Sequence, residues 1–305
     1  MSKSILVVGS TALDSVETVA GRVDDALGGS AFFFSAAASL LAPVGLVGVV
    51  GGDFPRDEIN FLAERGVNLD GLETVPGGLT FRWGGRYHEN MNDRTTLFTD
   101  LNVFESFDPH IPHDQRSAPV LFLANIQPTL QLNVLDQMIG PELVVTDTMN
   151  LWINLARPEL LEVVRRTGIF IVNDEEARML TGETSPLRGA QALQAMGPHT
   201  VIVKKGEHGA LMVGPEGRLF SMPAWPLADI TDPTGAGDTF AGGFVGSLAH
   251  DGAWGWSQLC RAMAWGSAMA SFCVQDFSVN RLRTLDLAQA RERFEGFRAL
   301  TTIPA

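Results

Sequence analysis

The sequence is poor in cysteine and lysine. Cys260 and Cys273 are the only cysteines among 305 residues, too few for a disulfide framework, which indicates a reducing compartment. Lysine supplies only three of the 22 cationic residues, against 35 acidic ones. With a formal net charge of −13 and no basic run, the chain lacks the clustered positive charge that nucleic-acid binding requires. We therefore expect no nucleic-acid partner, and expect any phosphate-bearing ligand to be held by local geometry.

Membrane segments are not expected either. The charge-free stretch 31–52 is nominally long enough to span a bilayer, but Pro43 divides it. The alanine-rich part before the proline predicts a buried helix, and the β-branched part after it predicts a buried strand. Residues 5–8 are too few for the apolar core of a signal peptide. We expect no membrane partner and a cytoplasmic location.

Short apolar runs alternate with helix-like stretches along the chain. Buried strands are predicted at 5–8, 44–50, 120–123, 143–146, 169–172 and 201–203. Helical patterns lie at 57–65, 129–138, 158–166, 174–181 and 187–196. Continuous apolar strands separated by helices are typical of a mostly parallel sheet that is covered on both faces. The sequence thus predicts an α/β protein, and its length suffices for one large core.

Two segments depart from this pattern, around residues 12–27 and 77–108. Residues 79–88 alternate at a period of two around Gly84 and Gly85, which predicts a hairpin with its turn at these glycines. Together the two segments are expected to form a small sheet that projects from the domain. Such a sheet is either a lid over a site or an ordinary surface hairpin, and the pattern favours neither.

A turn of small residues, Gly235-Ala236-Gly237, precedes a predicted helix. The first N–H groups of a helix are free and lie at the positive end of its dipole, so this turn predicts an anion site. Asp238 follows in the first helical turn. Its carboxylate is either a helix cap or a base placed where negative charge develops. Phosphoryl transfer needs both parts, donors for the oxygens and a carboxylate for the hydroxyl proton.

Other nucleotide-binding motifs are absent from the sequence. It has no Gly-Lys pair, which excludes a Walker A loop, and no G-x-G-x-x-G follows the first predicted strand. A Rossmann dinucleotide site therefore has no support.

The segment Asp232-Pro-Thr-Gly-Ala-Gly-Asp238 closely resembles the C-terminal signature of the PfkB (ribokinase-like) carbohydrate and nucleoside kinases. Weaker resemblances occur in the family's order, at Gly9-Ser10 with Asp14, at Gly28-Gly29, at residues 47–54, at the N-x-x-E segment 173–176 and at the G-x-x-G segment 206–209. The resemblance covers nearly the whole chain. It implies a three-layer ribokinase-like α/β fold, one domain over 1–305 with a small β lid, and an ATP-dependent kinase that phosphorylates a primary hydroxyl.

The resemblance also implies roles around the phosphates of ATP. Asp238 would be the general base, and the amides of Gly235, Ala236 and Gly237 would form the anion hole. The nucleotide would be bound by Asn173, Lys204, Gly206 and Gly209. Glu176 would hold Mg²⁺ through water, and Asp232 would contact a monovalent cation, with K⁺ as the candidate. From the residues alone, Asn173 and Glu176 also fit a capping box, and Lys204 also fits the exposed end of a strand.

On the acceptor side the resemblance implies that Asp14, Gly28 and Gly29 bind sugar hydroxyls, and that Asn150 shapes the floor of the site. The family commonly has asparagine where this chain has Phe33. Phe33 is either a core residue or a contact for the base of a nucleoside. The acceptor is expected to be a sugar, with a nucleoside as the alternative and an inactive nucleotide- or sugar-binding sensor as a remote one. The resemblance further implies a homodimer through the lid.

Overall fold

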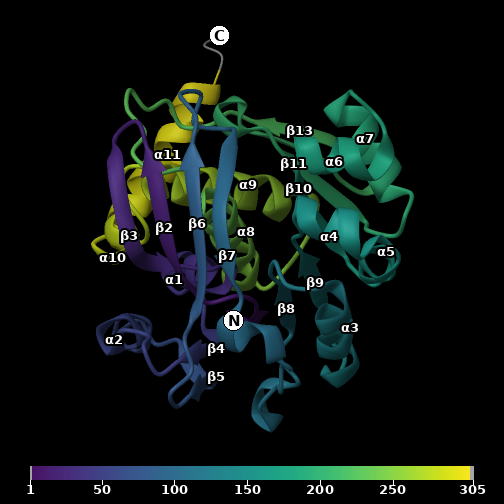
Figure 1. The fold of residues 1–305 in the computed structure, drawn as a ribbon. Helices are drawn as coiled ribbons and strands as arrows, with labels where there is room; N and C mark the ends of the chain where they lie inside the picture. The colour runs from purple at the N-terminus through teal and green to yellow at the C-terminus, as the bar shows by residue number, and fades with distance from the viewer. Residues whose placement is uncertain (1, 303–305) are drawn as a thin grey trace.

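The computed structural model describes residues 2–302, which form two β-sheets with helices around the larger one (Figure 1). The large sheet has nine strands in the order β13-β12-β11-β10-β9-β8-β1-β4-β5. Neighbouring strands are parallel except at β11–β12 and β12–β13. Its strands are β1 (Ile5–Val8), β4 (Val44–Gly51), β5 (Asn68–Val75), β8 (Val120–Leu123), β9 (Leu143–Thr146), β10 (Ile169–Asn173), β11 (Thr200–Lys204), β12 (Ala210–Val213) and β13 (Leu219–Met222). All six strands predicted from apolar runs belong to this sheet.

Helices cover both faces of the large sheet (Figure 1). One face packs against α1 (Ser30–Ala38), α2 (Arg56–Glu64), α8 (Ala236–Asp251), α9 (Trp256–Cys273), α10 (Asn280–Arg283) and α11 (Leu287–Thr301). The other packs against α3 (Pro128–Gln137), α4 (Asn150–Leu155), α5 (Arg157–Arg165), α6 (Asp174–Thr181) and α7 (Pro186–Gln194). The predicted three-layer α/β fold is thus confirmed. Alternating side chains of each strand enter opposite cores, which explains why the strands read as continuous apolar runs.

The charge-free stretch 31–52 contains most of α1 and then β4, as the composition change at Pro43 predicts. Phe34 of α1 stacks on Phe122 of β8, with ring centroids 4.2 Å apart. Among the described residues, no helix is both long and apolar enough to cross a membrane.

The second sheet has four strands in the order β3-β2-β6-β7 and lies beside the large sheet (Figure 1). Its strands are β2 (Ala12–Thr18), β3 (Gly21–Gly28), β6 (Phe81–Tyr87) and β7 (Arg94–Asp100). β2 pairs with β6 in parallel, while β2–β3 and β6–β7 are antiparallel hairpins. A small sheet therefore forms from the two segments that depart from the βαβ pattern.

The predicted turn at Gly84 and Gly85 is wrong. Both glycines lie inside β6, and the hairpin turns at residues 88–93, where the His88 amide donates to the Asp93 carbonyl over 2.9 Å. The glycines serve to make room for rings. A Cβ on Gly84 would lie 2.2 Å from the ring of Phe98, and one on Gly85 would lie 2.1 Å from the ring of Trp83.

α8 packs closely between α1 and α9. A Cβ on Gly242 would lie 2.5 Å from the Phe34 carbonyl oxygen of α1, and one on Gly243 would lie 2.7 Å from the Trp265 carbonyl oxygen of α9. Gly242 and Gly243 of α8 thus permit close approach of the neighbouring backbones, at a cost in helix propensity.

Candidate active site

The N-terminus of α8 carries the turn of small residues. Gly235 is the N-cap of α8 and has a left-handed backbone with φ +75°. The ring of Phe33 lies directly against it, since a Cβ on Gly235 would come within 2.4 Å of that ring. The Ala236 amide donates to the Pro233 carbonyl over 3.2 Å. Within residues 2–302, the amides of Gly235 and Gly237 have no hydrogen-bond acceptor. Two of the three predicted anion-hole donors are therefore free, and the third is engaged in the turn itself.

A half-buried lysine lies against this turn. Lys204 ends β11, and its Nζ is 3.0 Å from Asp147 Oδ2. A Cβ on Gly237 would lie 2.9 Å from the same Nζ. Burial alone would lower the pKa of Lys204. The charges of Asp147, Glu176 and Asp238 outweigh this effect, so the pKa is raised and the ammonium stays charged. Lys204 is therefore a fixed positive group beside the free amides.

Two acidic side chains around Lys204 hold protons more tightly than usual. Burial, and then the charge of Asp147, raise the pKa of Asp238 to about 7, although Lys204 and Arg94 oppose the shift. The same two causes raise the pKa of Glu176 to about 8. Asp238 is partly exposed, so a ligand can reach it. A carboxyl group whose pKa lies near neutrality is suited to accept a proton.

The predicted N-x-x-E segment forms the N-terminus of α6. Asn173 Oδ1 accepts from the Glu176 amide, and Glu176 Oε2 accepts from the Asn173 amide, each over 2.7 Å. This is a capping box. Asn150, predicted to shape the floor of the acceptor site, donates to Glu175 Oε2 over 2.9 Å. Its Oδ1 is buried without a partner in residues 2–302. The contacts of Asn150 thus group it with the N-x-x-E segment.

The predicted G-x-x-G turn follows β11 as a 3₁₀ turn, Gly206–His208. Gly206 and Gly209 both have positive φ, +54° and +78°, which favours glycine at each. The turn touches the small sheet, because Asn92 Nδ2 donates to Glu207 Oε2 over 2.6 Å.

Asp14 of β2 is the buried carboxylate on the acceptor side. Burial, and then the charges of Asp232 and Asp238, raise its pKa to about 8. Gly28 leaves room for it, since a Cβ on Gly28 would lie 2.0 Å from Asp14 Oδ2, whereas one on Gly29 would lie 2.5 Å from the Ser10 carbonyl oxygen. The Gly29 amide donates to the Asp14 carboxylate. A ligand whose hydroxyl groups donate hydrogen bonds to Asp14 would stabilise this buried carboxylate.

Asp232 and Phe33 are buried among protein groups. Asp232 accepts from the Thr234 amide over 2.8 Å and from the Ser278 amide over 3.2 Å, so both of its oxygens already have donors. Phe33 is 1% exposed and supports Gly235. Of its two interpretations, the contacts match the core residue.

Sequence reasoning did not single out Asn125, Trp152 or Arg94. Asn125 follows β8, accepts from Trp152 Nε1 over 2.8 Å and donates to Met149 Sδ over 3.0 Å. Its place after a buried parallel strand was a usable signal, because ligands bind outside the carboxyl ends of such strands. Arg94 carried no signal, since the turn was expected at Gly84 and Gly85.

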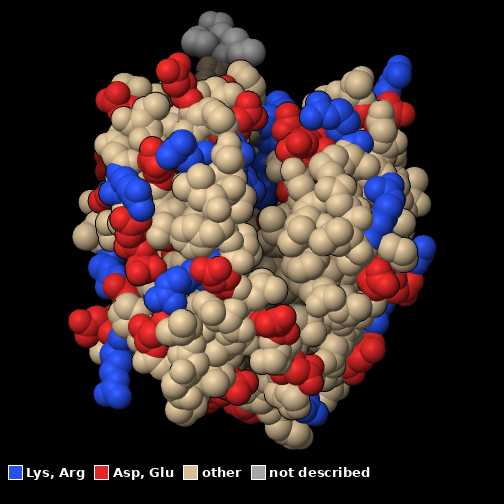
Figure 2. Space-filling view, viewed as in Figure 1, with Lys and Arg blue, Asp and Glu red and all other residues tan. Residues whose placement is uncertain are grey.

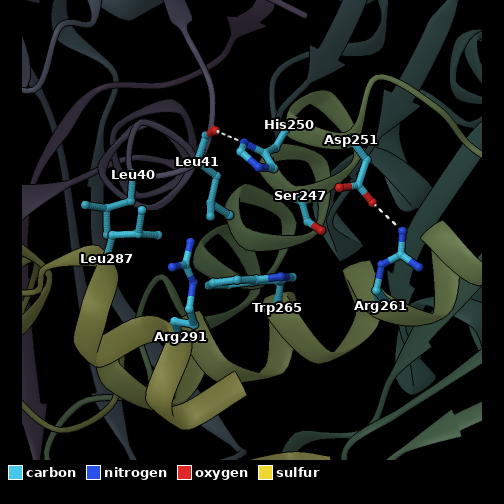
Figure 3. Close-up of a pocket in the computed structure, with 9 residues that line it drawn as sticks. All are labelled: Leu40, Leu41, Ser247, His250, Asp251, Arg261, Trp265, Leu287 and Arg291. Carbon is cyan, nitrogen blue, oxygen red and sulfur yellow. Dashed lines mark hydrogen bonds and ion pairs between the residues drawn. The ribbon is translucent and has the colours of Figure 1, made fainter. Parts of the chain in front are cut away.

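A groove crosses the face of the molecule on which the small sheet lies, and basic atoms line part of it (Figure 2). A separate cavity of about 90 Å³ (Figure 3) is lined by Ser247, His250 and Asp251 at the other end of α8. At 1.5 Å per residue, Asp251 lies about 20 Å along the helix from Asp238. This cavity is therefore not part of the site.

Comparisons with known proteins agree with this geometry. The profile of the pfkB family carbohydrate kinases matches residues 131–284, about half of the chain. The cytidine kinase of Thermococcus kodakarensis is 31% identical over 252 residues, which cover 81% of this chain and 88% of the relative. The chain belongs to the PfkB family. It is accordingly a phosphotransferase that acts on an alcohol group of a sugar or nucleoside.

Solved PfkB-family structures share its fold. The nucleoside kinase of Methanocaldococcus jannaschii, a member of the ribokinase family, superposes with a TM-score of 0.75 at 20% identity, covering 96% of this chain and 98% of that one. The ribokinase of Arabidopsis thaliana, complexed with ribose and ATP, gives 0.75 at 21% identity, covering 97% and 99%. The ribokinase-like fold expected from the resemblance is thus confirmed.

Proposed function

We propose that this PfkB-family protein transfers the γ-phosphoryl group of MgATP to a primary hydroxyl of a ribonucleoside. The observation that carries the proposal is the convergence at the start of α8. There a partly exposed acid, Asp238, lies in the same turn as two free amides, and the Lys204 ammonium lies beside that turn. Phosphoryl transfer requires this combination of a proton acceptor and donors for the phosphoryl oxygens.

In the proposed reaction Asp238 accepts the hydroxyl proton of the acceptor as the phosphoryl group moves. The amides of Gly235 and Gly237 donate to the oxygens of that group, and the Ala236 amide joins them if it leaves Pro233. Lys204 adds positive charge where negative charge develops. The small sheet acts as a lid that excludes water.

Mg²⁺ fits beside this turn. Asp147 and Glu176 bring two buried carboxylates together, and Asn150 offers a buried oxygen without a partner among the described residues. No cluster of three or more metal-ligating acidic, His or Cys side chains occurs in residues 2–302. A site of this kind suits Mg²⁺, which keeps waters and binds phosphate oxygens. We propose that Glu176 and Asp147 hold it through water, where it would neutralise phosphate charge. A K⁺ ion at Asp232 would bind carboxylate oxygens that already accept hydrogen bonds from two backbone amides.

The choice of a nucleoside rests on the small sheet and on one relative. Asp14 and Trp83 are register partners in β2 and β6, so their side chains lie on the same face. A ribose diol on Asp14 would leave the base near the Trp83 ring, which is suited to stacking. The identity with a cytidine kinase supports this choice. A free sugar is the second candidate, because the burial of Phe33 removes the other aromatic group proposed to face a base.

An ATP-consumption assay over pyrimidine and purine nucleosides, pentoses, hexoses and sugar phosphates tests the proposal. We expect nucleosides to give the highest kcat/KM, with cytidine among the substrates. A response to free sugars alone would move the assignment to the second candidate and leave the proposed chemistry in place. Retained ATP binding without turnover of any compound would instead favour the inactive sensor.

We also propose a homodimer through the free edge of the lid. Every residue of β7 is exposed, and Leu97 and Phe98 are 50% and 38% exposed there. An unpaired edge strand that exposes apolar side chains is a template for pairing with a second copy. Light scattering should give twice the chain mass of 32.9 kDa, and Leu97→Asp should reduce it to that of a monomer.

A further inference from the structure

The β6–β7 hairpin touches the site at two separated points. At the end of β6, Thr234 Oγ1 donates to the hydroxyl oxygen of Tyr87 over 3.2 Å, and Tyr87 is only 8% exposed. In the turn, Asn92 contacts Glu207 beyond β11. The hairpin therefore reaches from the loop that precedes α8 to the turn that follows Lys204.

Arg94 lies between these two contacts. It is the register partner of Tyr87 across β6 and β7, and opposed residues of an antiparallel pair place their side chains on the same face. Tyr87 points to Thr234, so Arg94 also faces the site. Trp83 belongs to this face too, because its ring covers Gly85. The Arg94 guanidinium carbon is 5.9 Å from the centre of the Trp83 ring.

The guanidinium group of Arg94 is free to bind a ligand. It makes no ion pair and no hydrogen bond with another described side chain or carbonyl. Its side chain is exposed, so a ligand can reach it. Its charge nevertheless reaches the centre of the site. Burial has the largest effect on the pKa of Asp238 and of Glu176 and raises both values. The positive charge of Arg94 acts in the opposite direction and lowers both.

We propose that Arg94 binds the transferring phosphoryl group from the lid, opposite Lys204 and the α8 amides. This inference rests on the proposed function and adds a residue to it. A guanidinium group offers a planar fork of donors that matches phosphoryl oxygens. Negative charge spreads over those oxygens during transfer, so a cation brought by a lid stabilises the transition state when the lid is closed. The contact of Asn92 with Glu207 places Arg94 toward the nucleotide rather than toward the far end of the acceptor.

The first test measures binding and needs no acceptor. Arg94→Gln is compared with Arg86→Gln, which removes the same charge from the same hairpin. Arg86 is exposed, points to the other face of the sheet and pairs with Glu17 over 3.0 Å. By calorimetry we expect Arg94→Gln to weaken the binding of MgAMP-PNP about tenfold and to leave that of MgADP unchanged. Arg86→Gln should change neither, and Arg94→Lys should lose less than Arg94→Gln.

The second test measures turnover with the substrate found in the acceptor screen. Arg94→Gln should lower kcat about a hundredfold without raising the KM of the acceptor, with an unchanged melting temperature. Equal weakening of AMP-PNP and ADP would show a structural role and overturn the inference. A rise in acceptor KM alone would place Arg94 on the acceptor and also overturn it. If the wild type phosphorylates no compound, the proposed function fails, while the AMP-PNP comparison still decides whether Arg94 meets the terminal phosphate.

Discussion

Replacing Asp238 with asparagine is expected to lower kcat about 10²- to 10⁴-fold, the contribution of a positioned general base, and to leave MgATP affinity nearly unchanged. Asparagine has the size of aspartate but cannot accept the proton of the acceptor hydroxyl. The free amides of Gly235 and Gly237 stay in place, because their geometry depends on the turn and not on the carboxylate. Steady-state kinetics and calorimetry on the same preparation measure the two effects separately.

The pH profile provides the control for this substitution. Burial and the charge of Asp147 raise the pKa of Asp238 to about 7, so the base is mostly protonated at pH 6. The wild-type kcat/KM, which reports ionisation of the free enzyme, should therefore rise as the pH passes through about 7. The Asp238→Asn profile should lose that step. A step near pH 7 that persists in the variant would assign the base to another group.

Stability distinguishes a chemical role of Asp238 from damage to the fold. Its pKa is about 7 in the native protein against the ordinary aspartate value of 3.8, so the native state holds a proton that the unfolded chain releases. This contribution to stability is complete below pH 3.8 and is lost as the pH rises through about 7. Asparagine does not ionise, so the melting temperature of the variant relative to wild type should be higher at pH 8 than at pH 5. A variant that is less stable at both values, and inactive, would point to misfolding.

The large sheet was predictable because of a simple physical fact. A strand that is covered on both faces must be apolar at every position, and residues 5–8 and 120–123 meet that requirement without interruption. The start of α8, with Asp238 in its first turn, was predictable for a similar reason, since small residues and a following acid have few other uses at that spacing.

The small sheet was harder to predict because glycine has more than one use. At Gly84 and Gly85 glycine provides clearance for the rings of Phe98 and Trp83, whereas the sequence pattern predicted a turn. That error also hid Arg94. Because Arg94 lies beyond the expected hairpin, the sequence could not predict which face of the small sheet its side chain occupies. The contacts of Asn150 were equally out of reach, since its pairing with Glu175 depends on how α4 and α6 meet in space.

Replacing Gly235 with alanine is expected to lower kcat about a thousandfold, at the upper end of the effect of losing an anion-hole donor. Two physical costs act at this position. A left-handed backbone with φ +75° costs alanine roughly 1–2 kcal/mol. A Cβ would also lie 2.4 Å from the Phe33 ring, and overpacking of this kind costs about 1–3 kcal/mol. The turn can relieve both only by moving, which displaces the Gly235 and Gly237 amides.

Gly66→Ala separates the two costs. Gly66 has nearly the same backbone, φ +76°, and nothing lies within 4 Å of the position that a Cβ would take. This control should lose about 1–2 kcal/mol of stability and keep the wild-type kcat.

In the double variant Phe33→Ala with Gly235→Ala, the clash is removed but the backbone strain remains. A double-mutant cycle should then show favourable coupling in stability between the two sites. Because the strain still displaces the amides, kcat should recover only in part. A Gly235→Ala enzyme with wild-type kcat would mean that the phosphoryl group meets other donors, and the anion hole would have to be sought outside this turn.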